Sequence, residues 1–346
     1  MGDPDMTARP QPHRPPTLES VAARAGVSRA TAGRVLQGSS TVGEAAREAV
    51  LKAAAELSYV TNRAARTLMT RRSDAVAFVV AEPEERFFSD PYFARILRGA
   101  HAVVAEHDVQ LVFAVLGDTA ERERFERFAR GGHLDGVVFV SLHGDDPLPG
   151  RLRAAGIPVV LAGRPFGEMG PPMPYVSADN VGGARMAVRL LAERGRRRIA
   201  TVTGPLDMTP GVDRLTGFVV ELEAQGLAPA GVAHGDFSMA GGRRAVTELL
   251  AAAPDLDGLF VASDLMAIGA LQGLADAGRS VPGDVAVVGF DDIPMAAASS
   301  PPLTTVSQPT LQTGRMLAER LLALADGADA GAPVVLPTTL VVRESA

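Results

Sequence analysis

The chain has 346 residues, which is enough for two or three domains, and its 47% hydrophobic content can fill sizeable cores. The absence of cysteine excludes disulfide bonds and thiolate metal sites. The start of the chain is polar and proline-rich, and no run of about 18 apolar residues appears anywhere. We therefore expect a soluble, cytoplasmic protein with no membrane partner, and a disordered tail over residues 1–16.

The net charge of −6 is unevenly divided along the chain. Residues 1–72 carry 11 Arg and Lys against 6 Asp and Glu, a net charge of +5, so residues 73–346 carry −11. A basic first segment on an acidic body predicts that only the first segment meets a polyanion such as DNA.

Three short helices are predicted after the tail. Thr17 can cap a first helix that ends at Gly26, and Ser28 can cap a second helix that ends at Gly38. A third helix is predicted over residues 44–57, where apolar side chains recur at helical spacing. Two helices joined by a short turn with a glycine form a helix-turn-helix unit, whose second helix can lie in the major groove of DNA.

The second helix presents side chains that suit this use. Ser28, Arg29 and Thr31 lie at its N-terminus, where base edges are read, and Arg34 lies one turn further on. Arginine offers a bidentate fork to guanine, and hydroxyl groups reach bases or phosphates. We predict that residues 17–58 bind DNA; the structural alternative is an ordinary amphipathic helix with a solvated polar face.

From Asp74 onward, short apolar strands alternate with amphipathic helices. The predicted strands include Ala75–Ala81, Gln110–Leu116, Gly136–Ser141, Pro158–Ala162, Ile199–Thr203, Gly258–Val261 and Val285–Phe290, and the predicted helices include Phe93–Glu106, Asn180–Arg194 and Asp264–Ala277. Near-continuous apolar strands separated by helices indicate parallel sheets that are covered on both faces. The predicted fold class is α/β, with two doubly wound parallel-sheet subdomains and a cleft between them behind the helix-turn-helix domain.

Three segments of the first part of the chain are typical of one protein family in their order and spacing: VAARAGVSRAT, RVLQGSSTV and NRAARTLMTRR. On these segments, residues 17–72 resemble the DNA-binding head of the lactose-repressor and purine-repressor (LacI/GalR) family. The resemblance continues through the body over nearly the whole chain. It implies a transcription regulator whose core is related in fold to periplasmic sugar-binding proteins.

The resemblance also implies DNA contacts outside the second helix. Asn62–Met69 match the family's hinge, which becomes helical when two copies meet in the minor groove of a bent operator. Leu68 matches the leucine that wedges between base pairs there, and such an apolar wedge kinks the duplex; a linker residue packed on the body is the structural alternative. The implied DNA-binding residues are Thr17, Ser28, Arg29, Ala30, Thr31, Arg34, Asn62, Arg63, Ala65 and Leu68.

Polar residues at the ends of predicted strands mark a candidate ligand site. Ligands of doubly wound sheets bind beyond the carboxyl ends of the strands. Asp291, Arg164 and the pair Ser263 and Asp264 each follow such a strand end. Carboxylates and arginines can pair with the adjacent hydroxyls of a sugar. For Asp264, a helix cap is the structural alternative.

The resemblance implies the same cleft and adds residues to it. Arg214 in VDRLTGF and Asp291 in VVGFDDIP match an arginine and a carboxylate that reach the family's ligand, and Ser263 lies where relatives carry a ligand-binding asparagine. Phe237, Tyr92 and Phe93 match aromatic residues of the pocket; a place in the core is the structural alternative for Phe93. The predicted effector-binding residues are Tyr92, Phe93, Arg164, Arg214, Phe237, Ser263, Asp264 and Asp291.

Two other classes of protein are alternatives to a regulator. An enzyme is disfavoured because the chain has no GxxxxGK[ST], GxGxxG or GxSxG motif and no metal-binding pattern among its six histidines. We therefore predict no catalytic residue, no metal and no cofactor. A small-molecule binding protein without DNA function would share the core but would not need the basic helical head.

These inferences give a domain plan of a tail (1–16), a helix-turn-helix domain (17–58), a hinge (59–72) and a core (74–346). The chain of the family crosses between the core subdomains three times. We accordingly assign about 74–174 and 306–332 to the head-proximal subdomain, and about 175–305 and 333–346 to the distal subdomain.

Two heads are needed to read two half-sites, so we predict a homodimer on pseudo-palindromic double-stranded operator DNA. The predicted function is a repressor whose operator affinity is set by a small effector in the cleft, in first place a neutral sugar. A nucleobase, a sugar phosphate and a corepressor rather than an inducer remain the alternatives.

Overall fold

The computed structural model describes residues 16–36, 39, 41–59, 72–167, 173–329 and 331–346. The chain divides into two compact units, Met1–Arg72 and Ser73–Ala346. The predicted tail and most of the predicted hinge, including Asn62, Arg63, Ala65 and Leu68, lie outside the described residues. Within the described residues, no helix is both long enough and apolar enough to cross a membrane.

The first unit is a bundle of three short helices, α1 (Leu18–Ala25), α2 (Arg29–Leu36) and α3 (Glu44–Glu56). Thr17 caps α1, since its hydroxyl accepts a hydrogen bond from the backbone N–H of Ser20, and Gly26 ends the helix with a left-handed φ of 67°. The core of the unit consists of Val21, Ala22, Ala32, Val35, Val50, Ala53 and Ala54. Small side chains at the contacts let the three helices pack closely around this core.

The second unit contains two sheets, and each has six strands within the described residues. The first sheet has the order β11 (Val334–Leu336), β5 (Tyr175–Ala178), β4 (Val159–Ala162), β3 (Gly136–Val140), β1 (Ala75–Val80) and β2 (Gln110–Val115). The second has the order β12 (Thr339–Val341), β10 (Thr304–Ser307), β9 (Ala286–Asp291), β8 (Gly258–Val261), β6 (Ile199–Thr203) and β7 (Gly231–His234). Neighbouring strands run parallel, except that β12 is antiparallel to β10.

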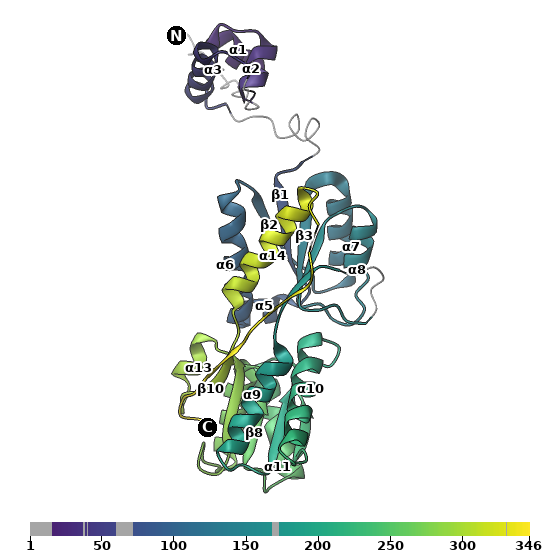
Figure 1. Ribbon diagram of the computed structural model, residues 1–346, viewed down its shortest axis with the longest axis vertical. Helices are drawn as coiled ribbons and strands as arrows, with labels where there is room; N and C mark the ends of the chain where they lie inside the picture. The colour runs from purple at the N-terminus through teal and green to yellow at the C-terminus, as the bar shows by residue number, and fades with distance from the viewer. Residues whose placement is uncertain (1–15, 37–38, 40, 60–71, 168–172, 330) are drawn as a thin grey trace, which may run out of the picture. The chain divides into compact units, whose positions relative to one another are not determined.

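Helices cover both faces of the first sheet (Figure 1). They are α5 (Glu84–Ser89), α6 (Pro91–Glu106), α7 (Thr119–Phe128) with a π-helical turn over Ala129–His133, α8 (Leu148–Ala154) and α14 (Thr310–Ala325). Strand β1 explains the arrangement, because its side chains alternate between two cores. Val76, Phe78 and Val80 pack with α6 and α14, whereas Ala75, Ala77 and Val79 pack with α7 and α8.

The second sheet is covered in the same way by α9 (Asn180–Glu193), α10 (Thr209–Ala224), α11 (Met239–Ala252) and α12 (Asp264–Asp276), with the short α13 (Pro294–Ala298) at one end. One core joins α9 and α10 to the sheet through Phe218, Phe260 and Phe290, and the other lies under α11 and α12. The predicted α/β class with two doubly wound subdomains is confirmed. We call the unit around the first sheet the first subdomain and the unit around the second sheet the second subdomain.

Helix α10 is held tightly against α9 at the level of the sheet. A Cβ on Gly217 would stand 2.4 Å from the carbonyl oxygen of Val181, so the close approach of the two helices requires glycine there. Glu221 is 1% exposed and accepts hydrogen bonds from Arg185 and Arg189 of α9. The hydrogen bond from Arg189 is the main reason that the pKa of Glu221 falls to about 2.

The chain crosses between the subdomains three times within the described part of the core, and each crossing lies a few residues later than predicted. Tyr175–Ala178 and Val334–Leu336, assigned to the distal subdomain, are β5 and β11 of the first sheet, where they pair with each other. Val306 and Ser307, assigned to the head-proximal subdomain, pair with β9 in the second sheet. Such short strands pair with partners far away in the chain, and local sequence patterns do not specify that pairing.

Candidate functional site

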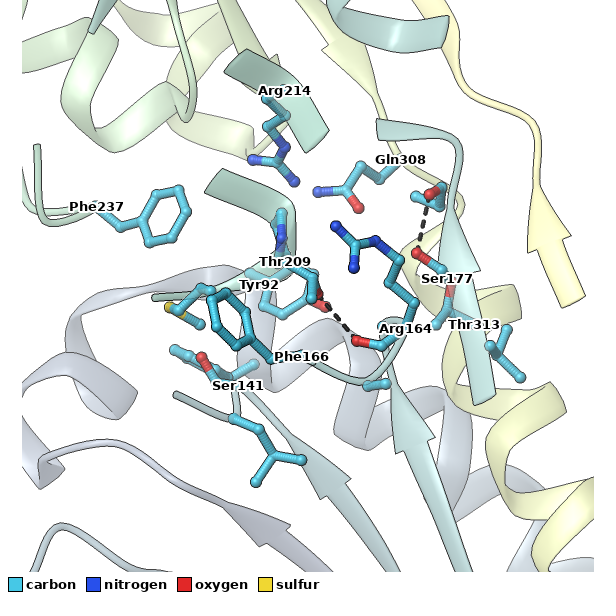
Figure 2. Close-up of a pocket in the computed structure, with 18 of the residues that line it drawn as sticks. Tyr92, Ser141, Arg164, Phe166, Ser177, Thr209, Arg214, Phe237, Gln308 and Thr313 are labelled. Atoms are coloured by element: carbon cyan, nitrogen blue, oxygen red, sulfur yellow. Dashed lines mark hydrogen bonds between the residues drawn. The ribbon is translucent and has the colours of Figure 1, made fainter. Parts of the chain in front are cut away.

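A cleft lies between the two subdomains of the core, at the carboxyl ends of the strands of the first sheet. Its empty volume, counting the part that is open to solvent, is about 960 Å³. Side chains from both subdomains line the cleft, among them Arg86, Asp90, Tyr92, Phe93, Ser141, Arg164, Phe166, Thr209, Arg214, Phe237, Asp291 and Gln308 (Figure 2).

Arg214 of α10 is the most deeply buried cation of the cleft, at 4% exposure. Its Nε donates to Oδ1 of Asn180 at 2.9 Å and its Nη1 donates to the carbonyl oxygen of Ala262 at 2.5 Å. The guanidinium carbon lies 3.8 Å from the ring centroid of Phe290, a cation–π contact. Burial lowers the pKa of Arg214, while the nearby Asp291 opposes that shift.

Asp291 supplies the opposing carboxylate at the end of β9. Its Oδ1 lies 3.4 Å from Nη1 of Arg214 and accepts a hydrogen bond of 2.5 Å from Nε2 of Gln308. Burial raises the pKa of Asp291 to about 6, because the charge of Arg214 offsets only part of the desolvation. Asp291 has a φ of 120°, which is a strained backbone conformation. Such conformations are frequent at ligand-binding sites.

The polar atoms of this pair are not all used by the protein. Among the described residues, no hydrogen-bond partner is found for Nη2 of Arg214 or for Oδ2 of Asp291. Figure 2 shows the guanidinium end of Arg214 directed into the cleft, near the amide of Gln308 and above the ring of Tyr92. The arrangement therefore offers a ligand one charged donor and one charged acceptor side by side.

Aromatic rings form the apolar walls of the cleft. Phe237 is 5% exposed, has a φ of 61°, and enters the cleft from the second subdomain. Tyr92 and Phe93 at the start of α6 face it from the first subdomain, with their ring centroids 5.4 Å apart and their planes nearly perpendicular. Phe93 lines the cleft, is fully buried and also belongs to the core under α6. Flat apolar faces beside paired polar atoms suit a sugar ring.

Arg164 lies at the cleft but is held by a residue of the opposite subdomain. Its guanidinium donates to both carboxylate oxygens of Asp213 on α10, with the shortest contact 2.7 Å from Nη2 to Oδ1. The hydroxyl of Thr209 donates to the carbonyl oxygen of Arg164 at 3.1 Å (Figure 2). A bidentate pair of this kind fixes the geometry, so Arg164 joins the two subdomains at one edge of the cleft.

Ser263 and Asp264 do not line the cleft, which corrects their predicted role. The hydroxyl of Ser263 caps α12 by accepting from the N–H of Met266. Asp264 is fully buried and accepts from the hydroxyl of Thr305 and from the N–H of Ile293, two residues after Asp291. Burial raises the pKa of Asp264 well above its usual value. Both residues follow a strand end, but their side chains are used to hold the second subdomain together.

Several cleft residues were missed by the sequence analysis. Gln308 follows β10, a four-residue strand whose pattern was not recognised. Asp90 caps α6 through a hydrogen bond to the N–H of Tyr92, and a cap residue is a common structural role. Arg86 and Phe166 lie on a short helix and on a loop, where no periodic pattern indicates which way a side chain points.

Most of the DNA-facing candidates on the described part of the first unit are exposed. Ser28, Arg29, Ala30 and Arg34 are exposed, and Thr31 is half-buried. The hydroxyl of Ser28 accepts from the N–H of Thr31, so it caps α2 as predicted. Arg29 pairs with Glu19 at 2.9 Å, but both side chains are more than half exposed. Such a surface pair is weak and can give way to a phosphate or a base.

Two family models match the chain. The model described as bacterial regulatory proteins, lacI family, matches residues 17–62, and the periplasmic binding protein-like domain matches residues 188–346. The chain is 48% identical over 336 residues to the HTH-type transcriptional regulator CelR of Thermobifida fusca, covering 96% of this chain and 98% of that protein. It is 32% identical over 332 residues to the ribose operon repressor of Halalkalibacterium halodurans, with 95% and 96% covered.

Solved structures give the same result. A complex of the transcriptional regulator CelR with cellobiose has a TM-score of 0.77 at 46% identity, and covers 96% of this chain and all of that chain. A lac repressor dimer bound to operator and the anti-inducer ONPF has a TM-score of 0.83 at 26% identity, with 96% and 99% covered.

The paired charges of the cleft lead to a first prediction. Whichever small molecule raises the melting temperature of the parent protein, Asp291→Asn and Arg214→Met should each weaken its binding at least about tenfold, because a hydrogen bond to a charged group is lost. Titration calorimetry measures the effect. The surface pair Arg243 and Asp276, at 2.5 Å, provides matched controls as Arg243→Met and Asp276→Asn. Equal affinities for the cleft variants and the controls would remove the pair from ligand binding.

Proposed function

The chain belongs to the lacI family of bacterial regulatory proteins and is a DNA-binding transcription regulator, and on that premise we propose that a neutral sugar, in first place a disaccharide, binds in its cleft and sets its hold on operator DNA. The observation that carries the proposal is the Arg214–Asp291 pair between aromatic walls. A regulator of this family is not an enzyme, so we assign the pair to binding rather than to catalysis. We place this activity in the cytoplasm, where bacterial operator DNA lies.

The exposed face of α2 supports the assignment of the first unit to operator reading. Ser28 at the start of α2, and Arg29 and Arg34 within it, are exposed. Ala32 and Val35 of the same helix are buried against the core of the unit. The positive charge of residues 1–72 suits phosphate contacts and the acidic core does not. The proposed roles of Asn62, Arg63, Ala65 and Leu68 in the minor groove rest on the family match alone.

We propose that two copies act together, as the lac repressor dimer does on its operator. One head reads only one half-site, and a pseudo-palindromic operator matches a two-fold axis. The edge of the first sheet offers an apolar surface for such pairing: Phe113 of the edge strand β2 is 40% exposed and Phe88 of α5 is 77% exposed. Phe87 lies within 5.0 Å of both rings, so the three side chains form one patch.

The charges of the cleft favour a neutral ligand over a phosphorylated one. Each arginine of the cleft already has an acidic partner: Arg164 has Asp213, Arg214 has Asp291, and Arg86 has Glu82. Asp90, at 6% exposure, adds a further carboxyl group. A phosphate would therefore meet carboxylates without an uncommitted cation, whereas sugar hydroxyls can donate to the carboxylates and accept from the guanidinium.

The ligand of a structural relative favours more than one sugar ring. Arg214, Asp291 and Phe237 lie toward the second subdomain, while Ser141, Leu142 and Phe166 line the cleft toward the first. The structural relative CelR was solved with cellobiose, a disaccharide, and this supports the same ligand class here.

An effector changes DNA binding only if it binds the two states of the protein unequally. A ligand that contacts Arg214 and Asp291 on one side and Tyr92 on the other stabilises the closed cleft, because an open cleft cannot offer both sides at once. We propose that closing changes how the first subdomains of the dimer meet, and hence how the two heads are held. Release of the operator by the sugar is the expected sign.

The ligand class is tested by a thermal-shift panel on the full chain. Cellobiose and other neutral sugars should raise the melting temperature, with a stabilisation of about 2.7 kcal/mol at a hundredfold excess over the dissociation constant. Phosphorylated sugars should stabilise poorly for the reasons of charge given above. A panel in which only nucleobases or only sugar phosphates stabilise the protein would overturn the neutral-sugar proposal and leave the regulator assignment intact.

The DNA-reading face is tested with Arg34→Ala. The variant should lose about 1–3 kcal/mol of operator affinity and discriminate less at one position in each half-site, because the bidentate contact to a base is gone. Competition gel-shift assays with a set of operator variants measure both effects. Arg47→Ala is the matched control on α3, since its guanidinium donates to the carbonyl oxygen of Ser39. If Arg34→Ala keeps the parent's ranking of operators, the proposed reading face is wrong.

A further inference from the structure

Glu82 is a buried acid whose one contact described so far is its ion pair with Arg86. It lies just after β1 in the first subdomain and is 3% exposed. Its Oε1 accepts from Nε of Arg86 at 3.1 Å and from the hydroxyl of Ser141 at 2.6 Å, and it lies 3.3 Å from Nε2 of His143. One carboxylate oxygen thus gathers three side chains of the first subdomain at the rim of the cleft.

Two of these three side chains reach the second subdomain. His143 Nδ1 lies 2.9 Å from Oδ2 of Asp207, which precedes α10. The backbone reinforces this contact, because the N–H of Gly144 donates to the carbonyl oxygen of Asp207 at 2.7 Å. The cleft is therefore bridged at this edge by a histidine placed between one carboxylate of each subdomain.

Arg86 makes the second bridge from Glu82. Its Nη1 donates to the carbonyl oxygen of Asp236 at 3.2 Å, and its guanidinium carbon lies 4.9 Å from the ring centroid of Phe237. Asp236 and Phe237 both belong to the second subdomain. Glu82 consequently anchors two separate bridges, one through His143 and one through Arg86.

We propose that Glu82 is a positioning residue for closure of the cleft, and that His143 is doubly hydrogen-bonded as an imidazolium between Glu82 and Asp207 when the cleft is closed, so that closing takes up a proton. The contact of His143 with Asp207 exists only when the subdomains are together. This inference rests on the proposed function in that effector binding and closure are the same event.

The chemistry of imidazole supports the protonated form. Both ring nitrogens of His143 face a carboxylate oxygen, and a neutral imidazole has only one N–H to donate. The neutral ring would therefore set a lone pair against a carboxylate on one side. In agreement, the hydrogen bond to Glu82 raises the pKa of His143, and Asp207 adds to this against the effect of burial. The pKa of Glu82 is lowered although burial acts to raise it, because His143, Arg86 and Ser141 all stabilise its charge.

The other charged groups nearby are committed elsewhere. Arg86, from α5, is shared between Glu82 and Asp90, the latter at 3.6 Å. In the loop after β3, Asp146 pairs with Arg122 at 2.9 Å, and the carboxylate of Asp145 lies against the backbone of Gly167. The proton uptake is therefore assigned to His143 between Glu82 and Asp207.

The direction of the pH dependence follows from linkage. The contact of His143 with Glu82 lies within the first subdomain, so closing raises the pKa of His143 further only through Asp207. The closed state is favoured fully at pH values below the pKa of the open state, and this advantage is lost as the pH rises through the higher pKa of the closed state. Each pKa unit gained on closing corresponds to about a tenfold change in the closing equilibrium. Asp291, with a pKa of about 6, adds its own pH dependence of closure mainly below pH 6.5. A change of affinity above pH 6.5 therefore reports on His143.

The experiment measures cellobiose affinity of the full chain by calorimetry between pH 5.5 and 9. The parent should bind more weakly as the pH rises above 6.5, by about tenfold for each pKa unit gained. His143→Gln should bind cellobiose more weakly than the parent at low pH, and its affinity should not fall as the pH rises above 6.5. Glu82→Gln should make the change of affinity with pH smaller. Both variants should keep the pH dependence near pH 6 that comes from Asp291. His133→Gln, an exposed histidine, is the matched control and should follow the parent. A parent profile that is flat above pH 6.5, or one that His143→Gln reproduces, would overturn the proposal.

A second readout is independent of any ligand. The chain has no cysteine, so Glu123→Cys on α7 and Glu223→Cys on α10 accept spin labels at two exposed sites only. Labelled subunits are diluted with unlabelled ones, so that the distance measured is the one between the two labels of a single subunit. The population with the shorter distance should grow as the pH falls from 8.5 to 6. The change should be absent when His143→Gln is added. If cellobiose does not bind, the sugar proposal fails, but these distances still test whether closure is linked to proton uptake. Distances that do not change with pH in the parent would refute proton-linked closure.

Discussion

The guanidinium of Arg214 is almost fully shielded from water, and several residues of the cleft stabilise its charge. A buried cation is costly unless it is paired and hydrogen-bonded. Asn180, the carbonyl oxygen of Ala262, Asp291 and the ring of Phe290 each offset part of the cost. Because the protein satisfies the guanidinium only in part, a ligand with hydroxyl groups can complete the set.

The pairing also explains why β9 ends as it does. Asp291 has to leave the strand with a φ of 120° to present its carboxylate to Arg214. Asp264 holds this strained turn from behind through the N–H of Ile293 and is fully buried. The two acids therefore have different tasks although both follow a strand: one faces the ligand, and the other fixes the backbone that carries it.

Several of the contacts across the cleft are polar. Arg164 with Asp213, His143 with Asp207, and Arg86 with the backbone of Asp236 all join the subdomains near water. Partly exposed ion pairs of this kind are individually weak. The subdomains can therefore separate and close again, which an extended hydrophobic contact would resist, and a ligand of modest affinity can shift that equilibrium.

Much of the fold could be predicted from the sequence because the predicted strands carry a strong apolar pattern. The α/β class, the capped helices of the first unit and the placing of Arg214, Asp291 and Phe237 follow from such patterns and from the family match. The crossing points were wrong because β5 and β11, of four and three residues, are defined by pairing with each other across the chain. Ser263 and Arg164 show a further limit: a strand end puts a residue near the cleft, but the side chain's partners decide its use.

The central claim is that binding of a sugar in the cleft and binding of an operator by the heads are one coupled equilibrium. The most direct measurement determines cellobiose affinity with and without saturating operator DNA, and operator affinity with and without saturating cellobiose. We expect both ratios to differ from one and to be equal, since coupling between two sites is reciprocal and typically about 5–150-fold. A cellobiose affinity that saturating operator leaves unchanged would contradict it.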